Sequence, residues 1–117
     1  MGNQQIIRVF NVKSDMPSVE EARRRLIEEL RNAKRSGVRV LKVIHGYGSS
    51  GAGGKLREPL GQSLRRRKKE GLVGAIIHGE VWGVFDDESR VLRERYPELR
   101  GDQDYNQSNE GITLVVL

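Results

Sequence analysis

The sequence contains no cysteine and no long apolar run. The absence of cysteine excludes disulfide bonds, thiolate zinc sites and cysteine nucleophiles. No apolar stretch approaches the length that a signal peptide or a membrane span requires. We therefore expect a soluble, cytoplasmic protein that does not associate with a membrane.

Size and charge narrow the class of protein further. The 117 residues are 36% apolar and 32% charged, which is enough for one modest core and predicts a single domain over residues 1–117. The net charge is +5 and the isoelectric point is near 9.9, which favours a polyanionic partner such as nucleic acid. Many of the charges alternate in sign along predicted helices, however, which is also typical of a solvated face.

Apolar spacing predicts an alternation of strands and helices. Short β-branched and aliphatic runs predict four strands, at residues 6–12, 38–44, 72–77 and 112–117. Apolar residues at helical spacing predict helices from residue 18 to Gly37, over 55–70 and within 86–100. Residues 81–85 could extend the third strand after a kink. This alternation predicts an α/β fold with a mostly parallel four-stranded sheet and helices packed on it.

A glycine-rich loop over residues 45–54 connects the second strand to the second long helix. Free backbone N–H groups at a helix start, with Lys55 and Arg57 nearby, favour an anion-binding site. A flexible connection that binds nothing explains the same glycines, because glycine tolerates positive φ.

Two nucleotide-binding interpretations of this loop are weaker. Gly46, Gly48 and Gly51 spell G-x-G-x-x-G, but the chain is short for a dinucleotide fold, and Glu70 lies at a helix end rather than a strand end. A P-loop would need Ser or Thr where Leu56 follows the lysine. A small nucleotide- or phosphate-binding α/β protein remains the alternative function at this point.

Three motifs, in order along the chain, resemble the Smr (small MutS-related) domain family. The first is the helix start Val19-Glu20-Glu21-Ala22, and the last is the strand within Asn109 to Leu117. The most specific is Ile44-His45-Gly46-Tyr47-Gly48 followed by Lys55-Leu56-Arg57-Glu58. The resemblance implies a β-α-β-α-β-β two-layer sandwich, similar to the C-terminal domain of bacterial translation initiation factor three. It also implies nucleic-acid binding, and in several members endonuclease activity on DNA or RNA.

The sequence departs from the family pattern at three places, one of which is the loop after Gly48, which is longer than usual. Where the family's first strand ends in Asp-Leu-His-Gly or Asp-Leu-Arg-Gly, this chain has Asn11-Val12-Lys13-Ser14. A neutral amide can neither act as a base nor give a charged ligand to a metal, so binding is expected to survive while catalysis is doubtful. Residues 86–109 are predicted to be an insertion before the last strand.

The resemblance and the residues together define a candidate site. The predicted nucleic-acid surface consists of Asn11, Lys13, His45, Gly46, Tyr47, Gly48, Lys55 and Arg57. His45 is the candidate catalytic acid or base, although it could instead hydrogen-bond its own loop. RNA is slightly preferred over DNA because the sequence shows no helix-turn-helix. A non-catalytic module that docks on a larger partner, such as a ribosome, is the third alternative.

Five further predictions concern a cofactor or metal site, three single residues and one basic run. No resident cofactor or metal site is expected, since two histidines without a third ligand make a weak case, and a divalent metal for hydrolysis stays open. His78 is interpreted as a hydrogen-bonded strand-end residue, Trp82 as a core residue and Tyr47 as an exposed stacking platform. The basic run Arg65 to Lys69 fits a solvated helix end and a phosphate contact equally well.

Overall fold

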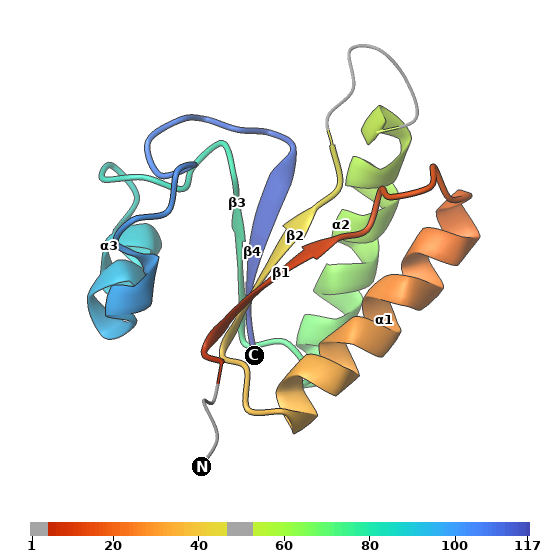
Figure 1. Ribbon diagram of the computed structural model, residues 1–117, viewed down its shortest axis with the longest axis horizontal. Coiled ribbons are helices and arrows are strands. Elements are labelled where there is room, and N and C mark those ends of the chain that lie inside the picture. Colours follow the sequence, from red (N-terminus) through yellow and green to blue (C-terminus); the bar gives the residue numbers. More distant parts are fainter. Residues whose placement is uncertain (1–4, 47–52) are drawn as a thin grey trace.

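The computed structural model describes residues 5–46 and 53–117, and these form the α/β arrangement that the sequence predicts (Figure 1). The elements in chain order are β1 (Ile7–Asn11), α1 (Val19–Arg35), β2 (Val40–Ile44), α2 (Gly53–Lys69), β3 (Ala75–His78), α3 (Asp87–Arg95), the 3-10 helix η1 (Pro97–Leu99) and β4 (Ile112–Val116). Residues 81–85 do not extend β3 and form turns instead.

The four strands lie in the order β1-β2-β4-β3. β1 pairs with β2 in parallel, and β4 pairs antiparallel with both β2 and β3. Three strands therefore share one direction, as a mostly parallel sheet requires, but two of the three pairings are antiparallel because the last strand enters between β2 and β3. As a result, the start of β4 lies at the same edge as the ends of β1, β2 and β3.

Helices α1 and α2 cover one face of the sheet (Figure 1). The Ser18 hydroxyl accepts a hydrogen bond from the Glu21 N–H at 3.1 Å and caps α1, as the capping-box pattern predicts. The predicted apolar stripes are buried against the sheet: Ala22, Leu26, Leu30 and Ala33 of α1, and Leu56, Leu60 and Leu64 of α2. Among the described residues, no helix is long and apolar enough to cross a membrane.

The start of α2 lies earlier than the sequence predicts. The helix is already formed at Gly53 rather than Lys55, so Pro59 lies in its second turn and not in its first. Proline has no N–H to donate to the carbonyl four residues before it, which is that of Lys55. The first turns of α2 therefore lack one helical hydrogen bond that the later turns do not lack.

The opposite face of the sheet is covered by the segment that the sequence marks as an insertion. Figure 1 shows α3 on the far side of the sheet from α1 and α2. A second apolar cluster lies between this segment and the sheet and is formed by Val40, Ile77, Trp82, Leu92, Leu99 and Leu114. The two-layer sandwich therefore describes the sheet with α1 and α2, while residues 82–105 add a partial third layer.

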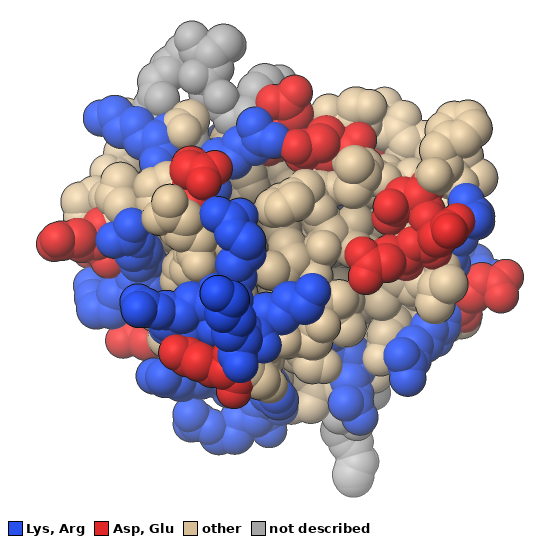
Figure 2. Space-filling model, turned by 180° about the vertical axis from the view of Figure 1, so that it is seen from behind, with Lys and Arg blue, Asp and Glu red and all other residues tan. Residues whose placement is uncertain are grey.

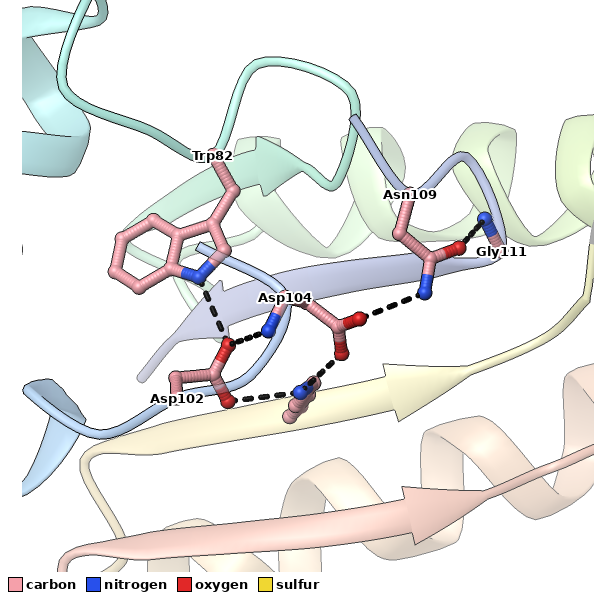
Figure 3. Close-up of polar contacts among 6 residues, drawn as sticks. Trp82, Asp102, Asp104, Asn109 and Gly111 are labelled. Carbon is pink, nitrogen blue, oxygen red and sulfur yellow. Dashed lines mark hydrogen bonds and ion pairs between the residues drawn. The ribbon is translucent and has the colours of Figure 1, made fainter. Parts of the chain in front are cut away.

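A buried ion cluster anchors this third layer to β2 (Figure 3). The Lys42 ammonium lies 2.7 Å from Asp102 Oδ1 and 2.5 Å from Asp104 Oδ2. Asp102 also accepts a hydrogen bond from Trp82 Nε1 at 2.9 Å, and Asp104 accepts one from Asn109 Nδ2 at 2.9 Å. The cluster thus fixes the loop after η1 to the middle of the sheet and orients the only tryptophan in the chain.

The charges in this cluster support one another. Burial by itself would lower the pKa of Lys42, but the hydrogen bonds and charges of Asp102 and Asp104 outweigh it and raise that pKa above its ordinary value. Burial likewise opposes ionisation of Asp104, yet the bonds from Asn109 and Lys42 hold its pKa below the ordinary value. Lys42 and Asp104 are therefore charged at neutral pH.

Candidate nucleic-acid interface

The candidate residues from distant parts of the chain meet at one edge of the sheet. Asn11 pairs with Ile44 in the β1–β2 register, and the backbone N–H groups of His45 and Gly46 both donate to the Gly111 carbonyl at 3.0 Å. Helix α2 begins at the same edge (Figure 1). The end of β1, the end of β2, the start of β4 and the start of α2 are therefore neighbours.

The residues after β1 form a tight turn that leaves a lysine in solvent. The Asn11 side-chain oxygen accepts a hydrogen bond from the Lys13 N–H at 3.1 Å, and both residues are exposed. Asp15 follows with a positive φ of 66° and is also exposed. Within the described residues, the Lys13 ammonium has no carboxylate within ion-pair distance. The turn therefore offers an amide that is already engaged and one free cation.

His45 is buried, with 3% of its surface exposed. Its Nδ1 lies 2.8 Å from the Gly46 carbonyl oxygen, and its Nε2 lies 2.9 Å from Thr113 Oγ1. Because a carbonyl can only accept, Nδ1 carries the proton and Nε2 accepts from the Thr113 hydroxyl. Gly46 follows with φ 78°, a conformation that favours glycine. His45 thus connects the turn after β2 to the neighbouring strand β4.

The electrostatic surroundings keep His45 neutral. Burial is the main cause that lowers the pKa of His45, and the nearby Arg57 and His78 lower it further. The Gly46 carbonyl and Glu80 act in the opposite direction and do not compensate. The neutral imidazole has both nitrogens engaged, one with Gly46 and one with Thr113 of β4.

Arg57 is held by two carboxylates that the sequence analysis did not single out. Its guanidinium pairs with Glu80, and it donates to Glu110 Oε1 at 3.3 Å. Both glutamates lie beside a strand-end glycine, Gly79 and Gly111, and this adjacency was the only signal available in the sequence. A side chain at Gly79 has no room, since its Cβ would lie 2.0 Å from the Asn109 carbonyl oxygen. The positive charge of Arg57 is therefore largely compensated at this edge.

The other predicted residues fall into three groups. Lys55 is exposed in the first turns of α2 and, within the described residues, has no ion-pair partner. Trp82 is 1% exposed, which confirms its interpretation as a core residue, and His78 is the partly buried last residue of β3. The predictions for Tyr47 and Gly48 lie outside the described residues. In the described part of the chain, no group of three or more histidine or acidic side chains could hold a metal ion.

Charge is unevenly distributed over the molecule. Helix α2 carries seven basic residues and one acidic residue, a formal charge of +6, whereas the whole chain carries +5. Residues 86–109 carry seven acidic and four basic residues, a formal charge of −3. Figure 2 shows lysine and arginine crowded over the side of the molecule that holds the long helices, and several acidic side chains on the side that holds α3. Helix α2 alone thus accounts for the basic character of the protein.

Comparisons with known proteins agree with this architecture. The crystal structure of the Smr domain of Thermus thermophilus MutS2 superposes with a TM-score of 0.57 at 22% identity, over 94% of this chain and 96% of that chain. No curated protein matches the chain. The family model of the Smr domain matches residues 16–75, which hold α1, β2, α2 and the first residue of β3. The chain belongs to the Smr domain family.

Proposed function

We propose that this domain binds nucleic acid at the sheet edge where β1, β2 and β4 end or begin beside the start of α2. The observation that carries the proposal is the convergence at this edge of three segments that are distant in sequence, those of Lys13, His45 and Lys55. Lys13, in the turn after β1, and Lys55, in the first turn of α2, are exposed and have no ion-pair partner in the described part of the chain. Together with the formal charge of +6 on α2, these two lysines suit a phosphodiester backbone. RNA is preferred over DNA, because the chain shows no helix-turn-helix for reading a duplex.

The residues support binding more than hydrolysis. Asn11 is neutral, and its side-chain oxygen is taken up by the following turn. His45 is buried and neutral, and the carboxylates of Glu80 and Glu110 compensate Arg57. We therefore assign His45 a positioning role for Gly46 and β4, and we assign phosphate contact to Lys13 and Lys55.

Binding is tested by fluorescence anisotropy with labelled single-stranded RNA and DNA of about 16 nucleotides, at about 50 and 200 mM salt. The wild type should bind, and its affinity should fall steeply with salt. The variant Lys13→Gln/Lys55→Gln should lose affinity and show a smaller salt slope, by about 0.7 for each lost contact. The matched control is Arg95→Gln/Arg100→Gln, which removes the same charge from exposed positions in the insertion.

The comparison between the two double variants tests the proposal. If both weaken binding equally, only the net charge of the protein matters, which contradicts a binding site at the sheet edge. Absence of binding by the wild type to RNA and DNA would overturn the proposal and favour the docking of this domain on a larger partner.

Cleavage is tested separately, by a time course with structured RNA and branched DNA, with and without magnesium. We expect no cleavage that depends on His45 as an acid or base. Cleavage by the wild type that is lost in His45→Ala, while circular dichroism shows an intact fold, would contradict the positioning role.

A further inference from the structure

The sheet edge alone supplies few free cations for a polyanion. Of the three basic side chains predicted there, Arg57 is compensated by Glu80 and Glu110, so Lys13 and Lys55 remain. Two phosphate contacts give only a weak interaction at physiological salt. Strong binding therefore needs further positive charge within reach of a strand that is bound at this edge.

Helix α2 carries such charge at its far end, and its exposed side connects the two ends through residues 58–64, which include no basic residue and one acidic residue, Glu58. Lys55, Gln62 and Lys69 follow one another at intervals of seven residues, and Arg66 lies one turn before Lys69, so they share one side of the helix. All four residues are exposed, while Leu56, Leu60 and Leu64 on the opposite side are buried. One exposed stripe thus runs from the sheet edge to the far end of α2.

The far end of the stripe is the most basic part of the molecule. We call it the helix-end cluster, and it consists of Arg65, Arg66, Lys68 and Lys69, which are all exposed. Within residues 5–46 and 53–117, no acidic side chain lies within ion-pair distance of the last three of them. Lys34, at the end of α1, donates to the carbonyl oxygens of Gly71 and Leu72, which brings a further ammonium close to the end of α2.

Helix stability does not account for a cluster of this size. One or two cations in the last turn are favourable because they face the negative end of the helix dipole. Four adjacent cations repel one another, and like charges four residues apart, such as Arg65 and Lys69, destabilise a helix. Three of the four lack a compensating carboxylate in the described part of the chain, which suits an anion supplied by a partner.

We propose that the helix-end cluster is a second backbone contact, so that a bound nucleic acid runs from the sheet edge along α2. This inference rests on the proposed function. The 14 residue steps from Lys55 to Lys69 span about 21 Å along the helix axis, a length that corresponds to about six phosphates of one strand in a duplex. A ligand that reaches both contacts is therefore bound more tightly than one that reaches only the edge.

The test compares Arg66→Gln/Lys69→Gln with the edge variant Lys13→Gln/Lys55→Gln and with the insertion control Arg95→Gln/Arg100→Gln. All six positions are exposed, so each variant should fold, which circular dichroism checks. Anisotropy is measured with single-stranded RNA and DNA in a length series from about 4 to about 16 nucleotides. The RNA and DNA arms show whether the contact distinguishes the two backbones.

We expect Arg66→Gln/Lys69→Gln to weaken binding of the longest oligonucleotides roughly ten-fold at low salt and to reduce the salt slope by about 1.4. Its affinity should stop rising at a shorter length than that of the wild type. If Arg66→Gln/Lys69→Gln binds as tightly as the wild type, the second contact is overturned. The same holds if Arg95→Gln/Arg100→Gln weakens binding as much as Arg66→Gln/Lys69→Gln does. Either result would leave the proposed contact at the sheet edge intact. Failure of the wild type to bind at any length would instead overturn the proposed function itself.

Discussion

The two faces of the sheet are covered by different chemistry. On the face of α1 and α2, the buried side chains are leucine, valine and alanine, and the charges lie outside. On the opposite face, a smaller apolar cluster surrounds Trp82, and a lysine with two aspartates is buried beside it. The first face is built from apolar spacing within each helix, whereas the second depends on polar contacts between residues some 60 positions apart.

This difference indicates which side of the domain is suited to binding and which to stability. The helix-covered side carries the basic α2 and the edge where the candidate binding residues meet. The side of residues 86–109 has a net negative formal charge and would repel a polyanion. We therefore expect substitutions on the sheet face covered by residues 82–105 to change stability, and substitutions along the edge and α2 to change binding.

The largest expected effect is on the sheet face covered by residues 82–105, from Lys42→Met on β2. Methionine keeps much of the side-chain length but leaves the carboxylates of Asp102 and Asp104 close together and unpaired. Breaking a buried pair in this way costs about 3–5 kcal/mol of the free energy of unfolding. Urea unfolding followed by Trp82 fluorescence and by far-ultraviolet circular dichroism measures the loss.

The control adds Asp102→Asn and Asp104→Asn to Lys42→Met. This triple variant should recover part of the lost stability, because no uncompensated charge remains. A loss below about 1 kcal/mol in Lys42→Met would mean that the cluster behaves like a surface ion pair, contrary to its burial.

The next prediction compares how the two apolar clusters respond to the loss of one buried leucine. Leu30→Ala on α1 should cost about 2–5 kcal/mol, because it leaves a cavity in the larger core, and both spectroscopic probes should report one shared transition. Leu99→Ala should loosen the smaller cluster first, so that the fluorescence of Trp82 changes before the circular dichroism. Coincident transitions in Leu99→Ala would show that both faces unfold as one unit.

The smallest expected effect is a pH dependence of stability that is caused by His45 at the sheet edge. Because the pKa of His45 is lower in the folded protein than its ordinary value of 6.5, the unfolded chain binds the proton more readily. Stability is then fully present above pH 6.5 and declines as the pH falls below that value. Thermal melting between about pH 5 and pH 8 should show this decline in the wild type and in His78→Gln, but not in His45→Gln. A decline that persists in His45→Gln would assign it to another group.

Much of the helix-covered face could be predicted from the sequence. The stripes at Ala22 and Leu26 of α1 and at Leu56 and Leu60 of α2, as well as the cap at Ser18, are local patterns whose physical cause lies within one element. The antiparallel entry of β4 between β2 and β3 was not predicted, because strand order depends on pairings that no local pattern encodes.

The candidate site was predictable as a set of residues but not as an electrostatic arrangement. The H-G-x-G motif identifies His45 and Gly46, and the position of the edge follows from strand ends in an α/β sheet. Arg57 and its partners Glu80 and Glu110 come from three different parts of the chain, and His45 contacts Thr113 on a different strand. No local sequence pattern indicates such contacts. The ion pairs of Lys42 could not be predicted either, since its partners Asp102 and Asp104 lie 60 and 62 residues later in the sequence.

Nuclear magnetic resonance tests most directly whether nucleic acid binds along the sheet edge and α2 and not on the side of residues 97–105. Backbone amide shifts of the wild type are followed while single-stranded RNA of about 16 nucleotides is added. We predict shifts at Lys13, His45, Gly46 and the exposed side of α2 from Lys55 to Lys69, and unchanged amides over residues 97–105. Shifts centred on residues 97–105, with the sheet edge and α2 unchanged, would contradict the account.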